Sequence, residues 1–535
     1  MKKRVHIRDF GSDEAVLSPL EPSDIAPIAN DAAEPVFRAI KAETKEKYDF
    51  SLDGFSALSL PIPKNDAEEA AIVNGFLSGL EKLFQKENNW GFLLPTTLSN
   101  EYCMQCNTCN EACPVYIESG RKDIYRPNFR AEVLRRILRR YFTMSGKLLG
   151  KWAGADLTLT WRVVYHLAEL AYRCSICRRC AAVCPIGVDN ALLARELRKV
   201  FSQEMGIAPE NVHKSGTIQH MKVGSSTGMT PLAFKDNIEF IEDIIEEKTG
   251  RRITIPVDKK GADILLVHNA GEYVAWPENP AAFAILFEAA GLNWTLSSEV
   301  MGYEGVNYGV WYDDIQFSRI AMAQIQAAKN LNVKKLVVGE CGHATKALIT
   351  IADRLLVGDS AIPRESCLPL LEEIVTSGAV KFDPAKNNFP VTLHDPCNIV
   401  RLMGIISPQR TILKHILPAG GLREMPNAGT NNYCCGGGSG FAIMNSHNFP
   451  EWRNNVAARM KARQVLAAFQ DVLDPSIPKY YCAPCSNCKG SARDALLGHF
   501  RFKDKYNIIY GGLVELMVNA MADVPQPFVS WEDEF

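Results

Sequence analysis

CMQCNTCNEACP at residues 103–114 and CSICRRCAAVCP at residues 174–185 are two copies of one cysteine pattern. In each copy, three cysteines lie three residues apart, a fourth follows four residues later, and a proline comes directly after it. Zinc sites usually combine cysteine pairs with a distant partner, and disulfide frameworks are typical of small secreted chains. The doubled pattern therefore favours iron–sulfur ligation over both alternatives.

The spacing is that of the ligands of two [4Fe-4S] clusters. Three closely spaced thiolates surround one cluster, and the fourth, displaced by the longer gap and the proline, reaches the other cluster. The first cubane is therefore expected on Cys103, Cys106, Cys109 and Cys184. The second is expected on Cys174, Cys177, Cys180 and Cys113. We predict a protein that carries electrons one at a time.

The composition indicates a globular protein with several cores. The 535 residues are 47% apolar and 22% charged, and this length suggests about three or four domains. A net charge of -2 gives no excess of positive charge of the kind that nucleic-acid-binding proteins use. The charged start MKKRVHIRDFG has no apolar stretch after it, and no run reaches the ~18 apolar residues of a membrane span. We expect a cytoplasmic protein that reaches a membrane only through partner subunits.

An N-terminal arm is expected over residues 1–95, with helical periodicity at 67–85. A helical two-[4Fe-4S] ferredoxin-type domain is expected over 96–205. Between its cysteine runs, NFRAEVLRRILRRYF alternates apolar and basic faces. The apolar face has Val133, Leu134, Ile137 and Leu138, and the basic face has Arg135, Arg136, Arg139 and Arg140. The basic face is either solvated or a docking face for an anionic partner or a membrane protein.

Residues 206–255 are predicted to be a linker, because its first part is polar and rich in turn residues, and a short amphipathic helix is expected around 235–248. From residue 256, short apolar strands alternate with helices, which predicts βαβ units and parallel sheets. The expected fold class is therefore α+β / α/β, a helical cluster domain followed by a duplicated α/β region. A degenerate repeat is expected over 256–385, an intact copy over 386–520 and a tail over 521–535.

The duplication is visible in three pairs of aligned segments. They are 266–271 with 392–397, 307–310 with 432–435, and 340–344 with 484–488. Gly271 stands where the second copy has Cys397, and Cys341 is the one cysteine that the first copy keeps. A fold doubled by duplication explains this pattern. Cys341 has lost its neighbours and is expected to be inert.

The second copy carries Cys397, the pair Cys434-Cys435 before a glycine run, and a later group of three cysteines. Adjacent thiolates can bridge two irons, and glycines let backbone N–H groups approach sulfur closely. The expected positions fall at the ends of strands, where α/β sheets place functional groups. The glycine run is not a phosphate loop, because no Gly-Lys-Ser/Thr follows it.

This second copy resembles the CCG domain of heterodisulfide-reductase-type proteins, and with the two-cluster domain the resemblance covers roughly residues 96–520. It implies a non-cubane [4Fe-4S] cluster. The implied ligands are Cys397, Cys434, Cys435, Cys485 and Cys488. Cys482 is a sixth cysteine, either a substitute ligand or a buried structural thiol. His394 is either a proton donor for disulfide cleavage or a structural polar residue.

Within that family, one intact copy, one degenerate copy with Gly-Glu-Cys-Gly-His and a long N-terminal arm resemble the DsrK type. The B subunits of Tmc complexes are a close alternative. The resemblance implies a cytoplasmic catalytic subunit of a membrane redox complex (DsrMKJOP) in dissimilatory sulfur metabolism. Electrons would pass between a quinone-linked, DsrM-like b-type cytochrome and a disulfide or trisulfide, that of a small DsrC-like sulfur carrier.

Other functions remain open at this point. The chain could be the electron-transfer subunit of a flavin-dependent 2-hydroxy-acid or glycerol-3-phosphate dehydrogenase. Because no GxGxxG fingerprint follows a strand, a flavin would belong to a partner. The chain could also be a D-type heterodisulfide reductase component acting on low-molecular-weight thiols, or an assembly protein whose clusters only stabilise the fold.

Overall fold

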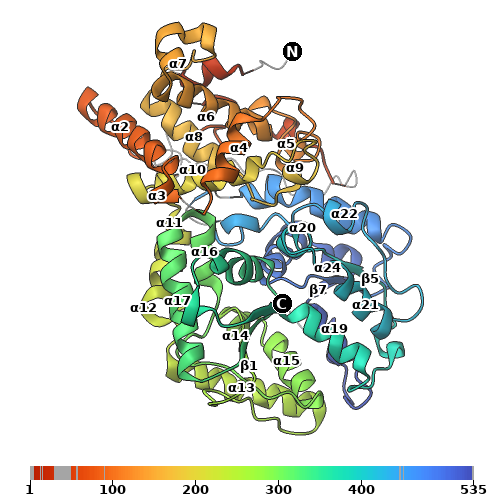
Figure 1. Ribbon diagram of the computed structural model, residues 1–535. Helices are drawn as coiled ribbons and strands as arrows, with labels where there is room; N and C mark the ends of the chain where they lie inside the picture. Colours follow the sequence, from red (N-terminus) through yellow and green to blue (C-terminus); the bar gives the residue numbers. More distant parts are fainter. Residues whose placement is uncertain are drawn as a thin grey trace. The chain divides into compact units, whose positions relative to one another are not determined.

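The chain forms two compact units in the computed structural model (Figure 1). The structure describes residues 5–12, 14, 16–28, 50–55, 58, 60–89, 91–444, 448, 449 and 451–532. Unit 1 comprises Met1–Val212, Trp311–Asp313 and Gly436–Met460, and unit 2 comprises His213–Val310, Asp314–Cys435 and Lys461–Phe535. Two units replace the three or four domains suggested by length, because both α/β copies share one hydrophobic core.

Unit 1 is helical. Its α-helices are α2 (Asp66–Leu83), α3 (Lys86–Asn89), α4 (Leu93–Glu101), α5 (Pro114–Glu118), α6 (Pro127–Phe142), α7 (Met144–Leu149), α8 (Trp161–Tyr172), α9 (Arg179–Ala182), α10 (Asn190–Met205) and α11 (Glu210–Val212). Helix α10 is central and packs against α2, α4, α6 and α8. Phe76 of α2 stacks on Phe201 of α10, with ring centroids 5.3 Å apart. The helix predicted at 67–85 is thus α2.

The predicted arm is tied to unit 1 wherever the structure describes it. Phe10, Leu52 and Phe55 are buried, and the Leu52 N–H donates to the Glu169 carboxylate of α8 at 2.6 Å. Residues 29–49 of the arm lie outside the described residues. Phe10 and the 50–55 segment therefore help to cover the helices of unit 1.

The helix predicted between the cysteine runs is α6, and its basic face is partly neutralised. Val133, Leu134 and Ile137 are buried. Arg135 is buried as well and donates to the Asn100 carbonyl at 2.8 Å, while Arg136 pairs with Glu132 at 3.0 Å. The solvated-face interpretation is thus wrong for Arg135. Further along the same helix, Arg139 is exposed.

A buried histidine makes the stability of unit 1 dependent on pH. His166 of α8 contacts the Phe10 carbonyl through Nδ1 at 3.1 Å and stacks on Phe50. Burial lowers the pKa of His166 to about 4, so the folded state keeps the ring neutral while the unfolded chain binds a proton below pH ~6.5. Stability is therefore lost as the pH falls from ~6.5 towards 4, by about 3 kcal/mol for the full shift.

At pH 5.5 roughly 1 kcal/mol of this loss is expected relative to pH 7.5. Urea unfolding of the anaerobic protein, followed by tryptophan fluorescence, measures it. The His166→Gln variant is expected to lose about 1 kcal/mol less stability over the same range. An identical pH dependence in both proteins would contradict the assignment.

Unit 2 has two parallel sheets. Their strands are β1 (Ile264–Val267), β2 (Trp294–Thr295), β3 (Lys335–Val338), β4 (Arg364–Ser366), β5 (Val391–Leu393), β6 (Lys479–Cys482) and β7 (Ile508–Gly511). The α-helices are α12 (Gln219–Val223), α13 (Pro231–Thr249), α14 (Glu272–Ala275), α15 (Glu278–Ala289), α16 (Glu304–Tyr312), α17 (Asp314–Asn330), α18 (Gly342–Thr345), α19 (Cys367–Ser377), α20 (Cys397–Leu402), α21 (Ser407–Ile416), α22 (Arg459–Ala468), α23 (Ser486–Ser491), α24 (Phe502–Tyr506) and α25 (Leu513–Asn519); α16 and α22 each cross the boundary between the units.

The two sheets have the same strand order. One sheet runs β2-β1-β3-β4 and the other β5-β6-β7, and an isolated parallel bridge sets Leu422 beside Val391 of β5, as β2 lies beside β1. Strands β3 and β6 are each followed by a cysteine N-cap, a short helix (α18 or α23) and a π-helix, Lys346–Ile351 or Ala492–His499. This correspondence supports the proposed duplication.

Helices associated with the two sheets also pack on each other. α15, which follows β1, packs on α25, which follows β7, and α21, which follows β5, packs on α19, which follows β4. This reciprocal packing is what an approximate two-fold axis between the two sheets produces. The resulting core runs from Met229, just before α13, to Val529.

Segments at both ends of the α/β region pack into its core. The helix expected around 235–248 is α13, whose Phe234, Ile238, Ile241 and Ile245 are buried in the unit 2 core. The expected tail is fixed as well, because Phe528 is buried and Trp531 packs on Phe389 with ring centroids 4.6 Å apart. Apolar side chains at helical spacing in α13 outweigh the polar turns that precede it.

Among the described residues, no helix is both long enough and apolar enough to cross a bilayer.

Candidate functional site

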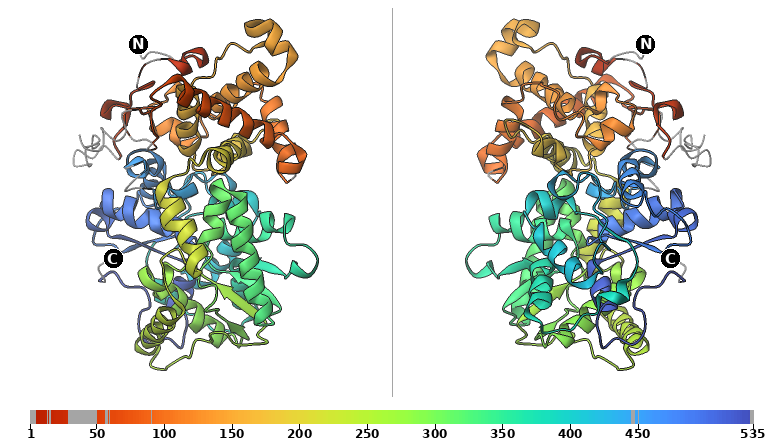
Figure 2. Two further views of the ribbon diagram at one scale, coloured as in Figure 1. Left: turned by 90° about the vertical axis from the view of Figure 1, so that its left-hand side faces the viewer. Right: turned by 90° about the vertical axis from the view of Figure 1, so that its right-hand side faces the viewer.

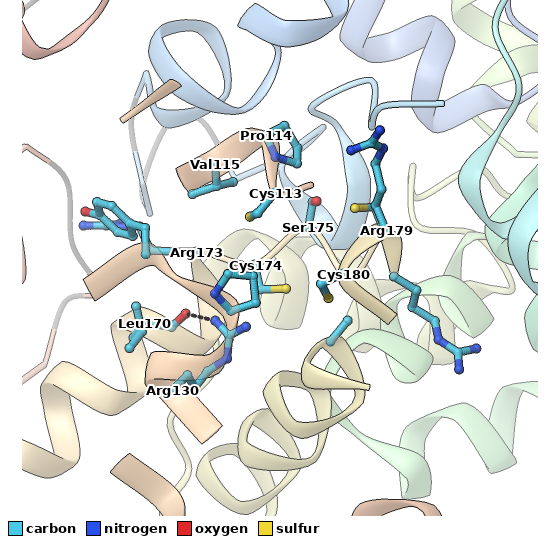
Figure 3. A pocket seen from close by; sticks show the side chains of 15 residues that line it. Cys113, Pro114, Val115, Arg130, Leu170, Arg173, Cys174, Ser175, Arg179 and Cys180 are labelled. Carbon is cyan, nitrogen blue, oxygen red and sulfur yellow. Dashed lines mark hydrogen bonds between the residues drawn. The ribbon is translucent and has the colours of Figure 1, made fainter. Parts of the chain in front are cut away.

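Unit 1 brings the eight cysteines of the repeated pattern together in two groups. One pocket is lined by Cys103, Cys106, Cys109 and Cys184, and the other by Cys113, Cys174, Cys177 and Cys180 (Figure 3). Each group thus combines three cysteines of one run with the fourth of the other. Cys109, Cys180, Ile176 and Ala191 pack in one small cluster, so the two pockets share a wall.

The same backbone geometry forms both ligand loops. In the first run, Gln105 and Asn107 have φ values of 56° and 66°, and in the second, Ile176 and Arg178 have φ values of 49° and 58°. Left-handed residues therefore stand on either side of the middle cysteine, Cys106 or Cys177. This conformation costs most for the β-branched Ile176, and such strain is characteristic of functional sites.

The donors around these thiols fit iron–sulfur clusters. The Ile176 N–H donates to Cys174 Sγ at 3.4 Å, and the Val188 N–H donates to Cys184 Sγ at 3.2 Å. Burial raises the pKa of Cys109 to about 11 and that of Cys113 to about 12. Thiolates in this environment need a bound cation, and four of them per pocket match the ligand set of a cubane.

The second pocket is richer in positive charge than the first. It is lined by Arg130, Arg173, Arg178 and Arg179, whereas the polar residues of the first are the amides and hydroxyl of Asn107, Thr108, Asn128 and Asn190. Arg173 and Arg178 pair with Asp53 and Asp189, but Arg130 donates to the Leu170 carbonyl at 3.0 Å. Positive charge favours an added electron.

We therefore expect the cluster on Cys113, Cys174, Cys177 and Cys180 to have the higher reduction potential. A redox titration followed by EPR measures both potentials. Arg130→Gln is expected to lower the higher of the two reduction potentials. Arg121→Gln removes an exposed arginine that is paired with Glu111, and it should leave both reduction potentials unchanged. Equal shifts in the two variants would contradict this prediction.

Five of the remaining cysteines belong to the part of unit 2 that contains the second sheet. Cys397 begins α20 after β5, Cys485 caps α23 after β6, and Cys488 lies on α23. Cys434 and Cys435 lie in the loop before Gly436, and all five are buried. Cys435 Sγ, Cys488 Sγ and His394 Nε2 lie within 4.8 Å of one another, a separation suited to a shared metal centre.

Gly436 is required for a reason that the sequence pattern does not show. Its φ is 90°, and a Cβ at this position would lie 2.5 Å from Ala458 Cα. The glycine after Cys435 therefore permits a close approach between two backbone segments of unit 1.

A buried hydrogen-bond chain fixes the orientation of His394. Lys461 Nζ donates to Asn432 Oδ1 at 2.7 Å, so the amide nitrogen of Asn432 faces His394 Nδ1 at 3.2 Å. His394 Nε2 then carries the proton and donates to Cys488 Sγ at 3.1 Å. Burial lowers the pKa of His394 to about 3 and that of Lys461 to about 8.

Lys461 and Asn432 are site residues that the sequence analysis missed. Asn432 was visible as part of the repeat, but Lys461 lies 29 residues further along the chain and belongs to no motif. Next to them, Arg410 donates to both carboxylate oxygens of Asp395 at 2.9 Å. Although burial opposes ionisation, these bonds lower the pKa of Asp395.

Cys482 lies apart from this group. It is the last residue of β6, pairs in register with Leu393 and Gly511, and belongs to the hydrophobic core. Its side chain is fully buried, and burial raises its pKa well above the ordinary value. Of the two interpretations of Cys482, this position favours the buried structural thiol.

Cys482→Ala is therefore expected to keep the full iron content. The substitution should lower only the free energy of unfolding, by roughly 1 kcal/mol, because it removes a small group from the core. Iron analysis and EPR of the anaerobically purified variant measure this. Loss of iron, with the cubane signals intact, would instead make Cys482 a ligand.

Two domain models match the chain. Residues 99–188 match the 4Fe-4S dicluster domain, and residues 391–491 match the cysteine-rich (CCG) domain. The chain thus combines two iron–sulfur domain classes. The unit 1 pockets lie in the first match, and the cysteine centre of unit 2 with His394 lies in the second.

About two thirds to three quarters of the chain is similar to iron–sulfur subunits named for Hdr-like or heterodisulfide reductase enzymes. It is 28% identical to the Hdr-like menaquinol oxidoreductase iron–sulfur subunit 2 of Archaeoglobus fulgidus, over 68% of this chain and 70% of the relative. The corresponding protein of Archaeoglobus profundus is also 28% identical, over 64% and 67%. The D component of the dihydromethanophenazine:CoB–CoM heterodisulfide reductase of Methanosarcina acetivorans is 22% identical, over 75% and 91%. No solved structure matches the chain.

Proposed function

We propose that this protein is the catalytic iron–sulfur subunit of a membrane-linked redox complex that exchanges electrons between a quinone pool and a disulfide or trisulfide. Two [4Fe-4S] cubanes would be held by the cysteines of unit 1. A non-cubane [4Fe-4S] cluster would be held by Cys397, Cys434, Cys435, Cys485 and Cys488. The observation that carries the proposal is the buried group of Cys435, Cys488 and His394 within a CCG domain.

The residues around this centre suit S–S chemistry. Cleavage of a disulfide takes two electrons and two protons, and a bound cluster would supply the electrons. Lys461 and Asn432 hold His394 as the neutral tautomer whose Nε2–H points at Cys488 Sγ. This N–H can stabilise a sulfur anion near Cys488 or pass on its proton.

The names of the relatives support a link to a quinol and to a disulfide. The relative at 28% identity is named as part of a menaquinol oxidoreductase, and the relative at 22% identity as part of a heterodisulfide reductase. These names favour electron transfer between a quinol and a disulfide for this chain. We propose a DsrM-like b-type cytochrome as electron partner and a DsrC-like sulfur carrier as substrate. The protein would be a DsrK-type component on the cytoplasmic face of the membrane.

The test uses the full chain, purified anaerobically with its clusters. Reduced viologen dye is mixed with the oxidised carrier protein, its trisulfide form, or a low-molecular-weight heterodisulfide. Dye oxidation that requires one of these substrates supports the proposal, and the preferred substrate distinguishes a DsrK-type protein from a heterodisulfide reductase. No turnover with any of them, at full cluster loading, would overturn it. Electron uptake from a flavin dehydrogenase would then favour the electron-transfer alternative.

A further inference from the structure

Cys341 and Cys485 occupy equivalent positions in the two copies of unit 2. Each follows the corresponding strand of its copy, β3 or β6, and is the N-cap residue of a short helix, α18 or α23. The helices meet at the boundary between the copies, where the Gly342 N–H donates to Cys485 Sγ at 3.4 Å. The Ser486 N–H donates in turn to the Glu340 carbonyl at 2.9 Å. The degenerate copy thus presents its remaining cysteine to the intact one.

The sulfur of Cys341 is buried and faces several N–H donors. Its side chain is 1% exposed. Ala344 N lies 3.4 Å from Cys341 Sγ, Asn307 Nδ2 lies 3.6 Å away, and Asn487 Nδ2, between Cys485 and Cys488 in sequence, lies 3.9 Å away. Three N–H donors therefore converge on this sulfur, as they do around sulfurs that ligate iron.

The neighbouring thiols continue the same group. The sulfurs of Cys341 and Cys485 are hydrogen-bonded to each other. Both side chains are buried, and N–H donors aimed at sulfur are a common feature of iron–sulfur ligands.

We propose that Cys341 is a sixth sulfur ligand of the iron–sulfur centre of the CCG domain, contributed by the degenerate copy across the approximate two-fold axis. This inference rests on the centre described under Proposed function. It replaces the expectation that Cys341 is inert, and it gives the first copy a role in the site after the loss of its other cysteines.

The test compares Cys341→Ser and Cys341→Ala with Cys367→Ala in the full, anaerobically loaded chain. Cys367 is an equally buried cysteine of unit 2, at the start of α19, and serves as the matched control. Cys341→Ser is expected to shift the EPR and Mössbauer signals of the CCG centre, and Cys341→Ala to lower its iron content. The cubane signals should stay unchanged in all three variants. Spectra and iron content equal to wild type in both Cys341 variants would overturn the proposal.

If a Cys341 variant fails to fold, Asn307→Ala decides the question. This change removes one donor to Cys341 Sγ and leaves every thiol in place, so the reduction potential of the CCG signal should move. An unchanged potential would overturn the proposal. These readouts need no disulfide substrate. If the protein turned over no disulfide substrate but the Cys341 variants still shifted the signals of the CCG centre, the proposed function would be wrong. The assignment of Cys341 as a ligand would stand.

A second, independent observation concerns the end of the helical insert in unit 1. Helix α7 and the 3-10 helix after it, Gly150–Ala153, expose four large apolar side chains. Met144 is 79% exposed, Leu148 78%, Leu149 57% and Trp152 85%. Figure 2 shows α7, in light orange, at one end of this unit from both sides. Apolar side chains gathered at such exposure mark an interaction surface.

Cations surround this apolar end. Arg139, Lys147 and Lys151 are exposed, and within the described parts of the chain none of the three forms an ion pair with a carboxylate, in contrast to Arg136 with Glu132. An exposed tryptophan and leucines flanked by unpaired lysines and arginine are complementary to an anionic bilayer surface. We propose that residues 142–152 dock directly on an anionic lipid membrane.

Co-sedimentation of the full chain with phosphatidylglycerol vesicles tests this proposal, with phosphatidylcholine vesicles as the neutral probe. Binding to the anionic vesicles that weakens with salt is expected. The double variant Leu148→Ser/Trp152→Ala should bind at least about 10-fold more weakly, whereas Leu232→Ser, an equally exposed leucine on α13, should bind as wild type. Absence of binding, or equal binding by all three proteins, would overturn the proposal and leave a protein partner for this surface.

Discussion

Cys435→Ala is expected to lower kcat/KM for disulfide reduction by more than about 100-fold while both cubane signals persist. Cys435 Sγ lies within 4.8 Å of both Cys488 Sγ and a ring nitrogen of His394, so the substitution removes one of the sulfurs that would hold the cluster. Removing only an outer-shell partner of a metal typically costs about 10–100-fold. Loss of a thiol ligand itself should exceed this range. Dye-coupled turnover with the preferred disulfide, together with iron analysis, measures the effect.

The matched control is Cys482→Ala, which removes a buried cysteine of the same domain from the hydrophobic core and should keep its activity. The two variants together separate a general effect of losing a buried thiol from an effect on the centre. Activity of Cys435→Ala within about 10-fold of wild type would contradict the assignment of this centre as the catalytic one.

The cysteine spacing was informative where the ligands lie on one short loop. The matching left-handed residues on either side of Cys106 and Cys177 show that equal spacing encodes equal backbone geometry. The crossed arrangement of Cys113 and Cys184 follows from the extra residue before each of them. Strands β1 and β3 and helix α15 were also recognisable, because continuous apolar runs and helical periodicity are local properties.

The same spacing misleads at Cys482. The stretch from Cys482 to Cys488 repeats the three-residue interval of 103–109, yet Cys482 ends a strand and points into the core. Side-chain direction alternates along a strand, so register and not spacing decides which cysteine reaches the centre. The contact of Lys461 with Asn432 and the position of Cys341 beside Cys485 both arise from packing between segments that are distant in the sequence. No pattern within one segment could reveal them.

Cys113→Ser is expected to remove the cluster of the other run. Cys113 belongs to the first cysteine run but lines the pocket of Cys174, Cys177 and Cys180. The variant should therefore lose about four irons per chain, and electron flow from dye to disulfide should fall to background. Cys184→Ser should do the same to the cluster on Cys103, Cys106 and Cys109.

The decisive measurement is a comparison of EPR spectra between variants. Cys113→Ser should lose the same signal as Cys177→Ser, and Cys184→Ser the same signal as Cys103→Ser. The shared wall between the pockets makes the reduced clusters magnetic neighbours, so the loss of either one should also remove the spin coupling from the survivor's spectrum. If Cys113→Ser instead matched Cys103→Ser, each run would hold its own cluster. The crossed arrangement, and with it the shared wall as the route between the clusters, would then be wrong.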